Sequence, residues 1–377
     1  MKNNGCPPLE IYVHIPFCAR KCAYCDFLSF PAGEDVQQAY TKALIKEIQA
    51  LPKEERPVSS VFAGGGTPSL VREDFIEEIL DHLRKTYTFS PDAEITLEAN
   101  PGTLTKEKLR RYKAAGVNRI SLGLQSCEDR ELALLGRIHT YRDFLESYAR
   151  VREAGFSNVN IDLMFALPGQ TLKTWVSTLG TVAALSPEHI SAYSLIIEEG
   201  TPFSKRKLSL PDEEEEYRMY EETGAVLERY GYRQYEISNY AKEGFPCRHN
   251  IGYWKRYDYI GIGLGAASLY LGERFSNTRS MKEYLSMSGE PDKIRRERTV
   301  LTRREEMEEF MILGLRMTEG VSEQAFWQHF GEKLDEVYGK VLNKYTDMGF
   351  MEQEQGWWRF SRKGIHVSNR ILAEFLE

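Results

Sequence analysis

Hydrophobic and polar positions follow two alternating periods along the chain as far as Leu195. Short runs rich in β-branched and apolar residues are separated by longer runs in which apolar residues recur every three or four positions. These are the periods of strands and of amphipathic helices. The expected strands are 10–15, 59–63, 94–99, 118–124, 158–165 and 189–195. The expected helices are 36–51, 72–87, 106–115, 141–154 and 172–185.

The regular alternation of strands and helices predicts an α/β fold with a parallel sheet. Repeated strand–helix units place their strands side by side, joined by right-handed crossovers. The run 158–165 is mostly apolar, as expected for a strand that is covered on its outer face. Six such units favour a (β/α)6 barrel, closed or partly open, with functional residues at the C-terminal ends of its strands.

The pattern changes after Leu210. An acidic run, 212–216, precedes an expected helix at 216–230, and we interpret these acids as charges that complement the helix dipole. Two β-like runs follow at 234–238 and 259–271, and the charged stretch 292–299 is expected to be a linker. The remaining elements are expected to be helices 303–317, 322–330 and 334–348, a hairpin at 350–360 and a helix at 365–376. This order predicts a barrel domain over 1–290 and a helical, winged-helix-like domain over 300–377.

Composition narrows the class of protein. The formal charge of −7 argues against nucleic acid as the main partner. No stretch reaches the roughly 18 consecutive apolar residues of a membrane-spanning helix, and the first residues lack the apolar segment of a signal peptide. We therefore expect a cytoplasmic protein without a transmembrane segment, whose six cysteines are mostly thiols.

Three cysteines lie together directly after the first expected strand. In the spacing Cys-x3-Cys-x2-Cys, they are Cys18, Cys22 and Cys25. Three thiolates in one loop can hold three corners of an iron–sulfur cubane and leave the fourth iron open. A zinc site would need a fourth ligand nearby, and Cys127 and Cys247 are distant in sequence. Neighbouring Arg20 and Lys21 favour the thiolate form.

Small and polar residues gather at the ends of the later strands. The second strand ends in Gly-Gly-Gly-Thr-Pro (64–68), where glycine permits close approach of the backbone to a ligand. Glu98, Gln125 and Asp162 lie at or near the ends of successive strands, and Arg137 follows in Leu-Gly-Arg-Ile-His. A carboxylate suits ribose hydroxyls and an arginine suits a carboxylate. Each residue alone could equally be a salt-bridge partner.

Together these motifs resemble the radical S-adenosylmethionine superfamily. The resemblance implies a [4Fe–4S] cluster on the three cysteines, with S-adenosylmethionine bound to the open iron through its amino and carboxylate groups. One electron from the cluster then cleaves the sulfonium to a 5′-deoxyadenosyl radical. The cofactor contacts that the resemblance implies are Tyr12, Tyr24, Gly65, Gly66, Thr67, Glu98, Gln125, Arg137, Asp162 and, more weakly, Ala267.

Within the superfamily, the chain is most similar to the group of the oxygen-independent coproporphyrinogen III oxidases and the HemW heme chaperones. The oxidases have a further cysteine two positions after the third one, where this chain has Phe27. They also have an N-terminal extension, whereas about ten residues precede the first strand here. Both departures favour the chaperones. The segments that carry this resemblance are 12–18, 64–68, 120–126, 135–139 and 161–171.

A second motif distinguishes the chaperones, Cys-Arg-His-Asn-Ile-Gly-Tyr-Trp at 247–254. It matches their His-Asn-x-x-Tyr-Trp motif, which the resemblance links to heme. A neutral His249 can ligate heme iron, Tyr253 and Trp254 offer flat apolar surface, and Arg248 could pair with a propionate. Cys247 is an alternative ligand, because residues 247 and 249 point to the same side of an extended segment.

The resulting hypothesis is a heme chaperone that transfers heme to apo-hemoproteins, among them respiratory ones. It would carry a [4Fe–4S] cluster and S-adenosylmethionine and would depend on a reductant such as flavodoxin. Two alternatives stay open: an oxygen-independent coproporphyrinogen III oxidase, and a radical enzyme that acts on heme itself. We expect no coproporphyrinogen oxidase activity, and whether any radical reaction is catalysed stays undecided.

Overall fold

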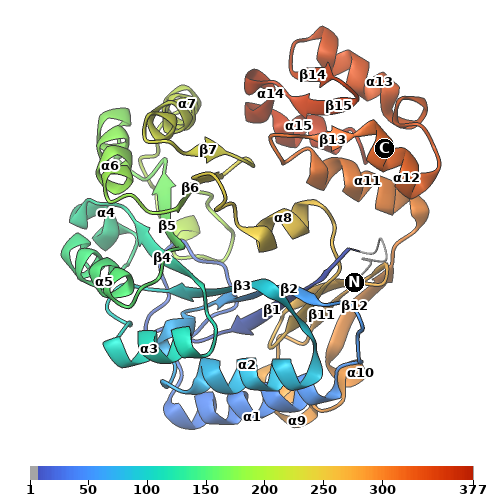
Figure 1. Ribbon diagram of the computed structural model, residues 1–377. Helices are drawn as coiled ribbons and strands as arrows, with labels where there is room; N and C mark the ends of the chain where they lie inside the picture. Colours follow the sequence, from blue (N-terminus) through green and yellow to red (C-terminus); the bar gives the residue numbers. More distant parts are fainter. Residues whose placement is uncertain (1–6, 377) are drawn as a thin grey trace.

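A computed structural model describes residues 7–376, and its central feature is one large, mostly parallel sheet (Figure 1). The first six strands pair in chain order, each parallel to the next. This arrangement confirms the predicted α/β fold with a parallel sheet. The strands are β1 (Leu9–Ile15), β2 (Val58–Gly65), β3 (Phe89–Ala99), β4 (Arg119–Gln125), β5 (Val159–Phe165) and β6 (His189–Ser194).

The barrel is open, because further strands extend the sheet at both sides to twelve. Beside β1 lies the parallel strand β9, followed by three antiparallel strands; beside β6 lie two antiparallel strands. These additional strands are β7 (Arg233–Gln234), β8 (Asn239–Ala241), β9 (Tyr259–Ile262), β10 (Ala267–Tyr270), β11 (Glu273–Asn277) and β12 (Arg295–Val300).

Helices cover the outer face of the parallel strands. Thr140 and Thr171 begin two of them with capping boxes, in which side chain and backbone satisfy each other's hydrogen bonds. Asp212 caps α7 (Glu213–Arg229), whose first turn is acidic, as the helix-dipole interpretation requires. The other helices of this layer are α1 (Glu34–Ala50), α2 (Phe75–Thr86), α3 (Lys106–Ala114), the short, unexpected α4 (Asp129–Leu134), α5 (Tyr141–Glu153) and α6 (Leu172–Ala184).

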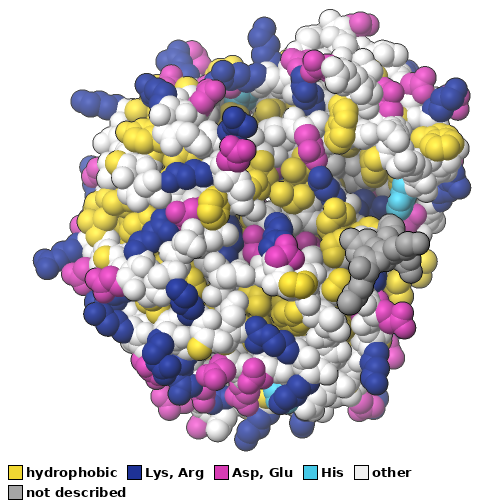
Figure 2. Space-filling model, viewed as in Figure 1, with side chains coloured by type: hydrophobic (Ala, Val, Ile, Leu, Met, Phe, Trp, Pro, Cys, Tyr) yellow, Lys and Arg dark blue, Asp and Glu magenta, His cyan; other side chains and the backbone are white. Residues whose placement is uncertain are grey.

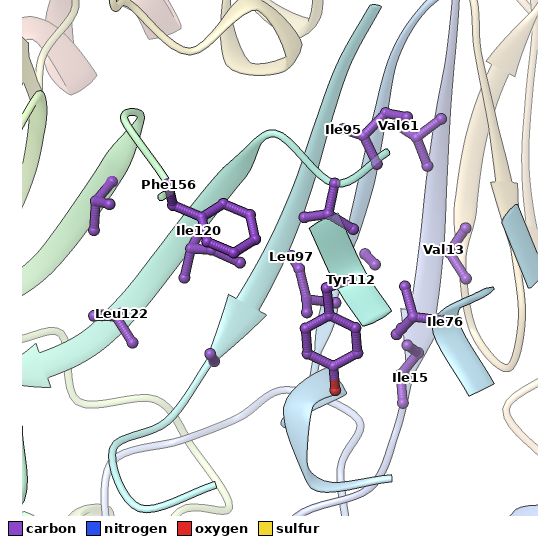
Figure 3. Packing of buried hydrophobic residues seen from close by; sticks show 14 of the residues in the cluster. Val13, Ile15, Val61, Ile76, Ile95, Leu97, Tyr112, Ile120, Leu122 and Phe156 are labelled. Carbon is purple, nitrogen blue, oxygen red and sulfur yellow. The ribbon is translucent and has the colours of Figure 1, made fainter. Parts of the chain in front are cut away.

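The core of the barrel domain lies between this helical layer and the sheet. Figure 3 shows part of it, where strand residues such as Val13 and Leu97 meet Ile76 of α2 and Tyr112 of α3. Each of these side chains is at most 3% exposed. Truncation of such a residue to alanine costs about 2–5 kcal/mol, so this layer fixes the strands whose ends carry the functional residues.

Several expected elements differ in detail from those of the structure. The expected linker 292–299 instead contains α10 (Pro291–Ile294) and the edge strand β12, whose exposed Arg298 pairs with Glu273 across the strands. Charges of this kind are typical of edge strands. The run 234–238 is mostly a loop between β7 and β8, and the run 259–271 divides into β9 and β10 at a turn.

The segment 247–254 is not extended but forms the helix α8 (Arg248–Trp254). Its N-terminus rests on a buried carboxylate from β3, since Glu94 accepts hydrogen bonds from the backbone amides of Arg248 (3.1 Å) and His249 (3.3 Å). A carboxylate at this position satisfies free amides and complements the helix dipole. In the middle of α8, Gly252 lies directly against the buried carboxyl of Glu10.

The C-terminal part has its own hydrophobic cluster, built around residues such as Met311, Phe326 and Leu342. It lies beside α8 and the β7 end of the sheet (Figure 1). The expected last helix is two short helices, which meet at Val367. Two separate cores support our proposal that 1–290 and 300–377 are distinct domains. The elements are α11 (Arg303–Gly314), β13 (Val321–Ser322), α12 (Glu323–Phe330), α13 (Leu334–Asp347), β14 (Met351–Glu354), β15 (Trp357–Phe360), α14 (Arg362–His366) and α15 (Ser368–Ala373).

Acidic and basic side chains are interspersed over the face shown in Figure 2. Across residues 7–376, no helix combines the length and the apolar character needed to cross a membrane.

The contact between Gly252 and Glu10 predicts opposite effects for two Gly→Ala changes within helices. A methyl group at Gly252 would overlap the Glu10 carboxyl, so Gly252→Ala should lower the free energy of unfolding by about 1–3 kcal/mol. Gly224 of α7 has open space around it, so Gly224→Ala should raise it by up to about 1 kcal/mol. Urea unfolding of both variants measures this. Equal effects of the two changes would contradict the packing described.

Candidate functional site

A cavity of ≈ 330 Å³ lies at the C-terminal ends of the parallel strands. The loop after β1 forms one wall, and the ends of β2 to β6 form the other. Its lining residues are Cys18, Arg20, Lys21, Cys22, Tyr24, Cys25, Phe27, Ser29, Gly65, Gly66, Glu98, Ala99, Asn100, Ser121, Gly123, Gln125, Arg137, Asp162, Met164 and Tyr193. The position confirms the expectation that polar strand ends meet in one place.

All three cysteines of the loop face this cavity as free, half-buried thiols. The Cys18 sulfur lies 3.5 Å from the Thr67 hydroxyl, and Arg137 donates a hydrogen bond to the Cys22 sulfur (3.6 Å). Burial raises the pKa of Cys25. Within the described residues, no three His, Cys, Asp or Glu side chains converge enough to hold one metal ion. Thiolates on three corners of a cubane need not converge in this way.

Arg137 connects the loop to the strand ends. Besides Cys22, its guanidinium donates to the Asn100 side-chain oxygen (2.5 Å) and to the Gly123 carbonyl (2.6 Å). The Asn100 amide in turn donates to Thr67 (2.7 Å). Sequence reasoning missed Asn100, although it stands two residues after Glu98 in Leu-Glu-Ala-Asn-Pro and so shares that strand end.

The glycine run at the end of β2 fits against the cysteine loop. The amides of Gly66 and Thr67 donate to the carbonyls of Ile15 (2.8 Å) and Phe17 (2.7 Å). Gly65 has a φ of +105°, and a side chain there would overlap the His14 ring. His14 donates from Nε2 to the Leu28 carbonyl (2.9 Å) and so connects β1 to the end of the cysteine loop.

Two half-buried acids, Glu98 and Asp162, line the cavity. Burial, and then the neighbouring Asp162, raise the pKa of Glu98 to about 7. Glu98 accepts a hydrogen bond from the Gly65 amide (3.0 Å). Burial also raises the pKa of Asp162, opposed by hydrogen bonds from Asn160 (2.7 Å) and Ser121 (3.0 Å). Such a pair suits a ligand that carries hydroxyl donors and positive charge.

The structure brings most of the expected contact residues together. Seven of them line the cavity: Tyr24, Gly65, Gly66, Glu98, Gln125, Arg137 and Asp162. Thr67 lies behind the loop, and Ala267, at the start of β10, does not line the cavity. Tyr12 also lies outside it, with its ring against Phe62 and its hydroxyl on His14 (3.0 Å).

Further lining residues escaped sequence reasoning. Tyr193 stands near the end of β6 and is 40% exposed, so the strand-end rule alone could have indicated it. Ser121 and Gly123 are alternate residues of β4, and their role depends on which face of the strand points inward. Met164 carries no chemical signal that would single it out.

The second motif lies away from this cavity, in the barrel interior. His249 is 1% exposed, and its ring is stacked on Phe62 at 5.2 Å. Its nitrogens are both occupied, Nδ1 by the Ser60 hydroxyl (2.8 Å) and Nε2 by the Tyr253 hydroxyl (3.0 Å). Burial, and then the positive charge of Arg119, lower the pKa of His249 to about 3, so the ring is neutral.

The neighbours of His249 are equally engaged. Cys247 is fully buried and donates from its sulfur to Glu94 (3.4 Å), and burial raises the pKa of its thiol. Arg248 pairs with Asp92 (2.7 Å), and the Trp254 ring lies 4.5 Å from the Arg316 guanidinium. In this conformation both ring nitrogens of His249 are hydrogen-bonded and the Cys247 sulfur is buried against Glu94, so neither residue presents a free donor atom at the surface.

The site combines three loop thiols, a glycine-lined strand end, an acid pair and the half-buried Arg137. This set fits an iron–sulfur cluster with a charged nucleoside cofactor. Fold and cavity together therefore define a radical S-adenosylmethionine barrel. The family model of the Radical SAM superfamily matches residues 12–182, and that of the HemN C-terminal domain matches residues 301–367.

Similarity to named relatives extends over nearly the whole chain. The heme chaperone HemW of Bacillus subtilis is 38% identical over 97% of this chain and 98% of its own length. HemW of Haemophilus influenzae is 37% identical, with 98% of each chain covered. The chain belongs to the HemW family of radical S-adenosylmethionine proteins. Membership of the superfamily implies a [4Fe–4S] cluster and S-adenosylmethionine.

Among solved structures, the coproporphyrinogen III oxidase HemN of Escherichia coli, a radical SAM enzyme, superimposes with a TM-score of 0.85. The alignment covers 98% of this chain and 90% of that one at 24% sequence identity. This similarity confirms the fold.

The raised pKa of Glu98 predicts a pH-dependent affinity for S-adenosylmethionine, which carries a net positive charge. Because Glu98 ionises near pH 7, affinity should rise by up to about tenfold from about pH 6 to about pH 8. In Glu98→Gln this rise should disappear. Calorimetric titration of the cluster-containing protein measures it, with the exposed Glu107→Gln as control. A wild-type affinity that is constant over this range would refute the assignment.

Proposed function

We propose that this chain is a heme chaperone, which binds heme and passes it to apo-hemoproteins, respiratory ones included. The observation that carries the proposal is the similarity over nearly full length to proteins named heme chaperone HemW. We place the protein in the cytoplasm and take the electron donor to be a small redox protein such as flavodoxin.

The cysteine loop supports this choice over a coproporphyrinogen oxidase. Phe27 lines the cavity and is 63% exposed. In the oxidases this position carries a fourth cysteine. Phenylalanine can neither ligate a metal nor transfer a proton, and it gives the mouth of the cavity apolar surface instead.

The resident cofactors are assigned to the cavity. Cys18, Cys22 and Cys25 would hold the cluster, and the remaining lining residues would hold S-adenosylmethionine. Glu98 and Asp162 suit the ribose hydroxyls and the positive charge of the cofactor. When bound, the reduced cluster supplies the electron that cleaves the sulfonium. The alternatives are oxidative decarboxylation of coproporphyrinogen III and a radical reaction on heme.

Heme is assigned to α8, in a conformation that differs from the one described. His249 is 1% exposed and its Nδ1 is bonded to Ser60 of β2, so it can ligate iron only after α8 moves away from β2. The same movement would expose the rings of Tyr253 and Trp254 as apolar surface for a porphyrin. When only the open form of a site binds, the apparent affinity for heme is the affinity of the open form multiplied by the fraction of protein that is open. A lowered affinity of this kind suits a carrier that must release its heme.

Heme titration tests the ligand assignment. His249→Ala should weaken heme binding at least about tenfold, because an axial ligand is lost, and should shift the Soret band. The matched control is His329→Ala on the exposed face of α12, which should behave like wild type. An unchanged Soret band and affinity in His249→Ala would remove His249 as the ligand.

An anaerobic assay separates the chaperone from the oxidase. With reductant and S-adenosylmethionine present, the chaperone should leave coproporphyrinogen III unchanged, because Phe27 replaces the further cysteine of the oxidases. Pigment analysis measures this. Clear formation of protoporphyrinogen would overturn the proposal.

A further inference from the structure

A continuous chain of hydrogen bonds joins the cofactor cavity to α8 through the barrel interior. It starts at Asp162, which lines the cavity, and passes through Asn160 and His189 on neighbouring inward positions of β5 and β6. It then reaches Tyr235, in the loop after β7, and ends at the amide of Cys247, the residue before α8. The four links measure 2.7, 2.6, 2.8 and 3.3 Å.

Chemistry fixes the proton in every link of this chain. Because a carboxylate only accepts, the Asn160 amide nitrogen faces Asp162, and its oxygen faces His189 Nδ1. Nδ1 of His189 must therefore carry the hydrogen. Burial lowers the pKa of His189 well below its usual value, so the ring is neutral and Nε2 accepts from the Tyr235 hydroxyl. The Tyr235 oxygen then accepts from the Cys247 amide.

In every link the donor is therefore on the side of α8 and the acceptor is on the side of Asp162. Hydrogen bonds aligned in this way polarise one another, so each one strengthens its neighbours. Ser191 adds a further donor to the Asn160 oxygen (3.1 Å), and Ser121 adds one to Asp162. The orientation of the Asp162 carboxylate thus depends on groups that end at the N-terminus of α8.

Tyr235 stands where three parts of the molecule meet. Its side chain lies between His189 and Cys247, while its backbone carbonyl accepts from the Thr318 amide of the C-terminal part (3.1 Å). A second path runs in parallel, since the Tyr12, Phe62 and His249 rings are stacked in a row. Displacement of α8 would break the end of the chain at Tyr235 and remove His249 from that row.

We propose that His189 and Tyr235 are positioning residues that couple the cofactor cavity to α8, so that S-adenosylmethionine and heme oppose each other's binding. The proposal rests on the proposed function, because heme ligation by His249 requires α8 to move. Binding of S-adenosylmethionine at Asp162 is favoured when the hydrogen-bond chain is complete and α8 is in the position described. Binding of heme is favoured when α8 has moved out of that position. Each ligand must weaken the other by the same factor, since coupling free energies are reciprocal.

The test measures this factor in both directions with the cluster-containing protein under anaerobic conditions. Heme is titrated by absorbance with and without saturating S-adenosylmethionine, and the affinity for S-adenosylmethionine is measured with and without heme. We expect each ligand to weaken the other by roughly fivefold or more. In Tyr235→Phe, and in His189→Gln, the factor should fall at least about threefold, since the chain is interrupted while the parallel aromatic path remains.

A matched control and a second measurement show whether the effect comes from the hydrogen-bond chain. Tyr230→Phe removes the hydroxyl of a 46% exposed tyrosine that ends α7 and should leave the factor unchanged. Nitrogen NMR should show the Nδ1–H tautomer of His189 in the wild type and in Tyr235→Phe, and the Nε2 resonance should shift in the variant because Nε2 no longer accepts a hydrogen bond. The proposal would be overturned if neither ligand weakens the other in the wild type. It would also be overturned if the ligands weaken each other in Tyr235→Phe by the same factor as in the wild type.

Failure of the proposed function would look different. If the wild type binds no heme, the chaperone assignment falls, and the positioning role is then decided by S-adenosylmethionine alone. Tyr235→Phe should still weaken that affinity at least about threefold, because Asp162 loses its fixed orientation. An unchanged affinity would overturn the positioning role as well.

Discussion

The structure depends on the pairing of polar groups inside an open barrel. Inward positions of the strands carry groups such as Glu94, Asn160 and His189, all buried, and an unpaired buried polar group costs about 1–3 kcal/mol or more. These groups find partners across the strands and, at one end, in α8. Glu94 shows this most directly, because its carboxylate supplies the helix with its N-terminal acceptor. Cofactor cavity and helix α8 are thus two ends of one polar interior.

This constraint explains why the heme motif is closed. A His249 that faced solvent would leave Ser60 without its ring partner and would strip the Glu94 carboxylate of the amides that it accepts from. Burial keeps His249 neutral, which is the form that ligates iron, but it also occupies both nitrogens. If His249 is the ligand that we propose, the same contacts keep it in the binding form and hold it away from the heme, and the position of α8 sets its availability.

The fold and most of the cavity could be predicted from the sequence, because both follow from local signals. Strand periodicity places Glu98 on β3 and Asp162 on β5, with Gln125 of β4 between them, and the cysteine spacing needs no distant partner. The conformation of 247–254 could not be predicted, since its helix is capped by Glu94, 155 residues away from His249. Asn100 was missed for a related reason: its role appears only when Arg137 and Thr67 are placed around it.

The arrangement also suits the conflicting demands on a carrier. Tight retention and ready release cannot both come from one rigid site, because a single affinity sets both. A helix that is stable in one position and functional in another resolves the conflict, provided that something besides the cargo biases its position. Tyr235 touches His189, the Cys247 amide and the Thr318 amide, so the cofactor cavity and the C-terminal part both act on α8 through it. Release of heme can then follow from a change at either of them, with no change in the ligand itself.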